Sequence, residues 1–125
     1  MARILVVDDE AAVLEIMRRS LERAGHTVTT ATNGAEALRL YRADPPDLVV
    51  TDLYMPETAG VTMIRELRSD YPDGLILAVS GGGQSMTGDV LADAEAYGAD
   101  ASLGKPFTPK QLQETVEALL LKRGA

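Results

Sequence analysis

The chain has 125 residues, the length of one ordinary domain and too short for two separate hydrophobic cores. Hydrophobic residues make up 46% and charged residues 25%, which is average for a globular domain and excludes a disordered or collagen-like chain. The net charge of -7 argues against direct nucleic-acid binding, and no apolar run reaches the roughly 18 residues of a membrane span, so we expect a cytoplasmic protein. The absence of cysteine excludes thiolate metal sites, and the single histidine, His26, excludes a multi-histidine metal centre.

Strands and helices alternate from the N-terminus onward. Residues 3–7 form a nearly continuous apolar run, which predicts a strand covered on both faces. Residues 11–24 place their apolar side chains on one stripe and are followed by a glycine, which predicts a helix. The more polar residues 27–31 predict a strand nearer an edge of the sheet. Asn33, with Glu36 three residues later, predicts the start of a second helix.

The same alternation continues to the C-terminus. Thr108 predicts the start of the last helix, because a proline follows at the first helical position and Gln111 completes a capping box. The other predicted elements are strands at residues 47–51, 75–79 and 101–103 and helices at residues 60–70 and 86–97. A glycine at position 88 weakens the last of these helices.

Strict alternation of five strands with five helices predicts an α/β fold. Such a chain forms a parallel sheet with right-handed crossovers and helices on both faces. No linker or repeat interrupts the order, so we expect residues 1–125 to form one domain with no effector domain in this chain. Ligands of such sheets bind at the carboxyl ends of the strands.

Polar residues follow the strong strands and should meet at that edge. They are Asp8 and Asp9 after the first strand, Asp52 after the third, Ser80 after the fourth and Lys105 after the fifth. Three carboxylates at one edge repel one another, a conflict that a hard divalent cation with a preference for oxygen removes. A site with few carboxylates and open positions for water favours Mg²⁺ over Ca²⁺, because Mg²⁺ keeps part of its hydration shell.

A cation beside a carboxylate, a hydroxyl and an ammonium group suits phosphoryl transfer, in which the protein positions groups and neutralises charge. We expect Asp52 to be the nucleophile, with Asp9 and Asp52 holding the metal and Asp8 assisting. Lys105 and Ser80 would contact the transferred phosphoryl oxygens. Each residue alone has a plainer explanation, such as a helix-terminal charge or a turn, and only their joint placement favours a site.

The residues also carry a resemblance to a known family. The segments ILVVDDE at residues 4–10, DLVVTDLYMP at residues 47–56, SG at residues 80–81 and KPF at residues 105–107 resemble bacterial response regulator receiver domains. Each segment is a weak motif singly, but in this order on alternating strands they are highly specific. The resemblance covers essentially the whole chain.

This resemblance implies a flavodoxin-like (βα)5 three-layer fold with strand order 2-1-3-4-5. It implies that Asp52 accepts a phosphoryl group from the phosphohistidine of a sensor histidine kinase or phosphotransfer protein, and loses it by hydrolysis. It further implies that the backbone carbonyl of Tyr54 ligates Mg²⁺. The output would be a contact with a downstream protein target, made by a monomer or weak dimer. The domain would be a signalling switch and not an enzyme that turns over a small molecule.

One departure from the family pattern bears on function, and three other functions compete with this interpretation. Receivers usually carry Tyr or Phe three residues before the Lys, where this chain has Ser102, so the usual aromatic readout is missing and a pseudo-receiver acting only as a binding module stays open. A haloacid-dehalogenase-like phosphatase needs a second Asp where Tyr54 stands. A flavodoxin-like electron carrier needs a phosphate cradle after the first strand, where Asp8 and Asp9 would repel phosphate.

Overall fold

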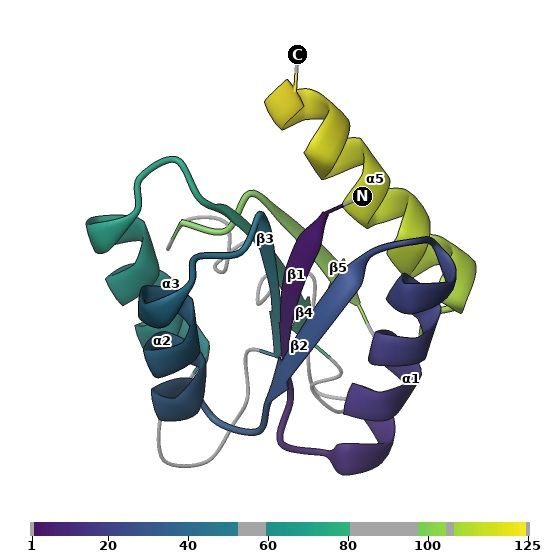
Figure 1. The fold of residues 1–125 in the computed structure, drawn as a ribbon, viewed down its shortest axis with the longest axis horizontal. Coiled ribbons are helices and arrows are strands. Elements are labelled where there is room, and N and C mark those ends of the chain that lie inside the picture. Colours follow the sequence, from purple (N-terminus) through teal and green to yellow (C-terminus); the bar gives the residue numbers. More distant parts are fainter. Residues whose placement is uncertain (1, 53–59, 81–97, 105–106, 125) are drawn as a thin grey trace.

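The computed structural model describes residues 2–52, 60–80, 98–104 and 107–124. Five strands form one parallel sheet with the order β2-β1-β3-β4-β5 (Figure 1). The strands are β1 (Arg3–Val7), β2 (Thr27–Ala31), β3 (Leu48–Asp52), β4 (Leu75–Ser80) and β5 (Ala101–Gly104). The two least apolar strands, β2 and β5, lie at the edges, as predicted. The predicted α/β fold and strand order are confirmed.

Helices cover both faces of the sheet. The described helices are α1 (Ala11–Arg23), α2 (Gly34–Ala43), α3 (Gly60–Asp70) and α5 (Pro109–Gly124). Figure 1 shows α1 and α5 on one face and α2 and α3 on the other. The helix predicted at residues 86–97 lies outside the described residues. Within the described ranges, no helix combines the length and apolar character needed to cross a membrane.

The helix ends follow the predicted capping chemistry. The side chain of Asn33 accepts a 2.8 Å hydrogen bond from the backbone N–H of Glu36 at the start of α2. At the start of α5, Thr108 and Gln111 each accept the other's backbone N–H, at 3.0 and 2.8 Å. Gly25 follows α1 with φ 97°, a left-handed conformation that glycine adopts without strain. Local sequence thus determines where these helices begin and end.

Two hydrophobic layers, one on each face, explain why the central strands are almost continuously apolar. Along β1, the side chains of Leu5 and Val7 join the layer beneath α2 and α3, while Ile4 and Val6 join the layer beneath α1 and α5. All four are at most 2% exposed. Each of these four residues therefore faces one helical layer or the other, so none of them has to be polar.

Four predicted strand boundaries were wrong by one residue. β3 begins at Leu48, and Asp47 just before it bonds to the first residue of β1. The Asp47 carboxylate accepts the N–H of Arg3 at 2.8 Å, and the N–H of Asp47 donates to the Arg3 carbonyl at 2.8 Å. At the other end, β3 includes Asp52, β4 includes Ser80 and β5 includes Gly104. Asp52 and Ser80 are thus the last residues of their strands, not the first residues after them.

Candidate functional site

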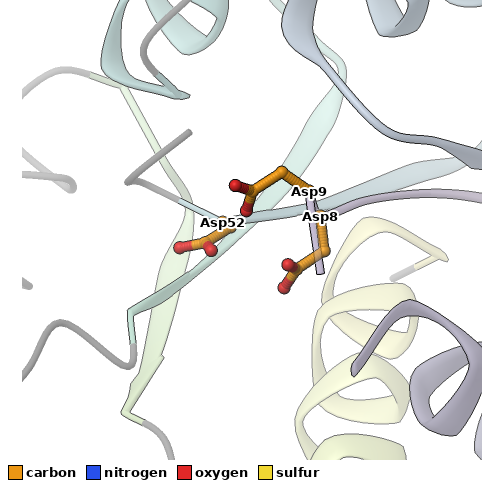
Figure 2. A group of neighbouring side chains, drawn as sticks. All are labelled: Asp8, Asp9 and Asp52. Carbon is orange, nitrogen blue, oxygen red and sulfur yellow. The ribbon is translucent and has the colours of Figure 1, made fainter. Parts of the chain in front are cut away.

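The carboxyl ends of β1 and β3 bring three acidic residues together. The two strands are neighbours, and their register pairs Val7 with Thr51, so Asp8 and Asp52 follow at the same level of the sheet. The carboxylate oxygens that Asp8, Asp9 and Asp52 contribute lie within 4.8 Å of one another. Figure 2 shows the three side chains gathered there. The sheet topology thus unites residues that are 44 positions apart in the sequence.

The three carboxylates differ in their exposure to solvent. Asp8 is fully buried, Asp52 is 5% exposed, and Asp9 lies at the exposed margin. The backbone N–H of Glu10 donates a 2.9 Å hydrogen bond to Oδ1 of Asp8, which fixes the orientation of that side chain. The N–H of Asp8 also donates to the carbonyl of Ala31 at the end of β2, at 3.2 Å. The acidic group therefore lies at the carboxyl end of the sheet, and Asp9 is its solvent-exposed member.

The spacing of these oxygens suits a small divalent cation. Ligands around an octahedral ion at about 2.1 Å lie between about 3 and 4.2 Å apart, so oxygens within 4.8 Å need only small side-chain rotations to share one. A donor set made only of carboxylates, partly exposed to water, fits Mg²⁺, which keeps some of its water ligands. Among the described residues, this acidic group could hold a metal ion.

The structure reaches the other predicted site residues only in part. Ser80 is the last residue of β4, which lies beside β3. The register pairs Asp52 with Val79, so the backbone of Ser80 lies at the same edge of the sheet as Asp52. The structure does not describe the side chain of Ser80, and Tyr54 and Lys105 lie outside the described residues. Lys105 follows Gly104, the last residue of β5, directly in the sequence. Their predicted contacts therefore stay predictions.

One residue beside the site was missed by the sequence reasoning. The hydroxyl of Thr51, fully buried, donates a 3.0 Å hydrogen bond to the backbone carbonyl of Asp52. The available signal was a single hydroxyl at the end of the otherwise apolar run at residues 48–50. His26, in contrast, accepts a 3.1 Å hydrogen bond from the N–H of Ala2 through Nδ1, at the opposite end of β1. That histidine serves the start of the sheet and not the acidic group.

Comparison with known proteins identifies the family to which the chain is similar. A family model described as the response regulator receiver domain matches residues 4–117. The chain is 42% identical over 123 residues to the transcriptional regulatory protein PrrA of Mycobacterium tuberculosis, covering 98% of this chain and 52% of that protein. It is 43% identical over 118 residues to the response regulator MprA of Mycolicibacterium vanbaalenii, covering 94% and 50%. The chain thus spans about half the length of these curated relatives.

Solved structures show the same relationship at the level of the fold. The chain superposes on a response regulator receiver domain protein of Clostridium thermocellum with a TM-score of 0.89 at 30% identity, covering 99% of this chain and 98% of that one. It superposes on the chemotaxis response regulator CheY4 of Vibrio cholerae with a TM-score of 0.86 at 30% identity, covering 95% and 98%. From its sequence motifs, its strand order and these matches, we conclude that the chain belongs to the response regulator receiver domain family.

Proposed function

We propose that this receiver domain is a phosphoacceptor switch of a two-component phosphorelay, phosphorylated on Asp52. The observation that carries the proposal is the meeting of Asp8, Asp9 and Asp52, whose carboxylate oxygens lie within 4.8 Å at the carboxyl ends of β1 and β3. Two of the three are buried. Placing like charges this close is unfavourable unless a cation shares them, so the arrangement favours a metal-dependent function.

The proposed reaction transfers a phosphoryl group from a phosphohistidine to the protein. A carboxylate oxygen of Asp52 attacks phosphorus, the P–N bond breaks, and the electron pair returns to the imidazole of the donor. Asp9 and Asp52 would hold Mg²⁺ with help from Asp8 and the carbonyl of Tyr54. Bound Mg²⁺ supplies charge neutralisation at the phosphoryl oxygens. Lys105 and Ser80 would contact those same oxygens.

The proposal makes the domain a signalling switch whose only catalysis is its own phosphorylation and dephosphorylation. The donor would be a sensor histidine kinase or phosphotransfer protein, and the output a contact with a downstream protein. The net charge of -7 opposes direct binding of nucleic acid by this domain. We propose a monomer or weak dimer in the cytoplasm, with residues 1–125 forming a single receiver domain.

A second candidate is a pseudo-receiver that binds its partner without phosphorylation. The observation that favours it is Ser102 in β5, where the register pairs it with Ala78. Receiver domains usually have an aromatic residue at this position, and its ring moves on phosphorylation. The serine of this chain has no ring that could report phosphorylation in this way. The intact acidic group argues against this candidate, because a pure binding module has no need of three adjacent carboxylates.

The deciding experiment measures intact mass after incubation with acetyl phosphate and Mg²⁺. We expect one phosphoryl adduct on the wild type and none on Asp52→Asn or in the presence of a chelator. Glu10→Gln is the matched control, since it removes a neighbouring carboxylate that lies outside the acidic group, and it should still be labelled. An unmodified wild type that also fails to bind beryllofluoride would favour the pseudo-receiver.

A further inference from the structure

Thr51 places a hydroxyl where the fold has no packing need for one. It is the penultimate residue of β3, it is 0% exposed, and the register puts it between Val7 of β1 and Ala78 of β4. Both neighbours belong to the hydrophobic layer beneath α2 and α3. Valine has nearly the same shape as threonine and would fill this place without burying a polar group. The hydroxyl therefore calls for an explanation other than packing.

The hydrogen bond of this hydroxyl supplies that explanation. Oγ1 of Thr51 donates to the backbone carbonyl oxygen of Asp52 at 3.0 Å. The bond closes a short ring that contains ψ of Thr51 and both φ and ψ of Asp52. These dihedral angles set the direction in which the Asp52 side chain leaves the backbone. A single buried hydroxyl thus restrains the backbone of the residue that carries the carboxylate, at the point where the sheet ends.

We propose that Thr51 is a positioning residue for phosphoryl transfer, and that its hydroxyl orients Asp52 for attack on phosphorus. This inference rests on the proposed role of Asp52 as the phosphoacceptor. Transfer reactions depend steeply on the alignment of the nucleophile, and a misplacement of about 1 Å can slow a reaction by as much as about a hundredfold. A loss of restraint at Asp52 would therefore slow phosphorylation without removing any group that contacts the donor.

Two substitutions separate the hydroxyl from the methyl group of Thr51. Thr51→Val keeps the shape and removes the donor, whereas Thr51→Ser keeps the donor and removes a buried methyl. The measurements are the rate constant of phosphorylation by acetyl phosphate at saturating Mg²⁺ and the free energy of unfolding in urea. We expect the rate constant of Thr51→Val to fall about fivefold, which corresponds to the net free energy of one ordinary hydrogen bond. The rate constant of Thr51→Ser should stay within about twofold of wild type.

Stability should follow a different order from the rate. Thr51→Ser should be the less stable of the two variants, because it leaves a small cavity in an apolar layer. Val49→Ala is the matched control: Val49 is buried on the same face of β3, two residues earlier, and its truncation destabilises the strand without touching the Asp52 carbonyl. We expect its rate constant to stay at the wild-type value.

The outcomes distinguish this inference from the proposed function. A wild-type rate constant for Thr51→Val, with the wild type phosphorylated normally, overturns the positioning role and leaves Asp52 as acceptor. Rate constants that fall in proportion to lost stability in all three variants also overturn it, because they show a purely structural role. A wild type that takes up no phosphoryl group overturns the proposed function itself.

Discussion

Arg68 of α3 donates a 2.7 Å hydrogen bond through Nη2 to Oδ2 of Asp100, and that same oxygen accepts the backbone N–H of Ile76 at 2.8 Å. The guanidinium also donates to the carbonyls of Gly98 and Gly74, at 2.6 and 2.7 Å through Nη2 and Nη1. One side chain thereby joins the end of α3 to the beginnings of β4 and β5. It lies at the end of the sheet opposite the acidic group.

We expect Arg68→Ala to lower the free energy of unfolding by about 2–3 kcal/mol, because it removes a donor from several carbonyl groups and one of the two donors to the Asp100 carboxylate. The side chain is 25% exposed, so water replaces only part of what is lost. Urea titration followed by circular dichroism would measure the change. Arg39→Ala on α2 is the control: Arg39 is exposed and forms no ion pair with a described residue, so its loss should cost less than about 0.5 kcal/mol. Equal effects of the two substitutions would show that Arg68 contributes only its charge.

Gly74 is constrained by a close approach of Tyr41. A Cβ atom at position 74 would lie 2.5 Å from the hydroxyl oxygen of Tyr41, whose side chain is buried. We expect Gly74→Ala to destabilise the protein by about 1–3 kcal/mol, since a buried ring has little room to move. The double variant Tyr41→Phe/Gly74→Ala should be more stable than the sum of the single effects predicts, because the clashing atom is gone. Strict additivity in denaturant melts would refute the clash.

The acidic group should couple stability to Mg²⁺. At a Mg²⁺ concentration ten times the dissociation constant, the free energy of unfolding should rise by about 1.4 kcal/mol, because only the folded chain assembles the three carboxylates. Asp9→Asn should weaken this response, since it removes one of the charged oxygens. Thermal melts across a Mg²⁺ titration would measure both. Glu10→Gln, just outside the group, should respond as the wild type does, and a loss of response there would point to a nonspecific charge effect.

Glu15 on α1 should contribute an acid-sensitive part of the stability. The Glu15 carboxylate accepts hydrogen bonds from Arg18, which has the larger effect, and from Arg19. These bonds lower the pKa of the Glu15 carboxyl from 4.5 to about 2. Because the folded-state pKa is the lower one, the stabilisation is complete above pH 4.5 and disappears as the pH falls toward 2. The side chain is 43% exposed, so the effect should be small and weakened by salt.

The check is the difference in unfolding free energy between wild type and Glu15→Gln from pH 6 down to pH 2. That difference should shrink as the pH falls. Glu117→Gln on α5 is the control, because Glu117 is exposed and has no ion pair with a described residue. A difference for Glu15→Gln that stays constant with pH would rule out the titration of Glu15 as its origin.

Local patterns in the sequence sufficed for the described strands and helices and for the three carboxylates that the structure brings together. The capping pair Thr108 and Gln111 acts within one helical turn, so its partners are near in the sequence and can be recognised there. The apolar run before Asp52 indicates a strand buried on both faces without any knowledge of its neighbours. The boundary error at Asp47 arose because its partner, Arg3, is 44 residues away.

The sequence by itself thus determined the alternation of the described strands and helices up to β4, and it placed Asp8, Asp9 and Asp52 at the carboxyl ends of strands. The tertiary structure decided the register of β1 and β3, which pairs Val7 with Thr51 and brings the carboxylate oxygens within 4.8 Å of one another. It also decided that Thr51 is fully buried and bonded to the Asp52 carbonyl. The physical reason is that capping and periodicity depend on neighbours along the chain, whereas register, burial and side-chain partners depend on how both hydrophobic faces of the sheet pack at once.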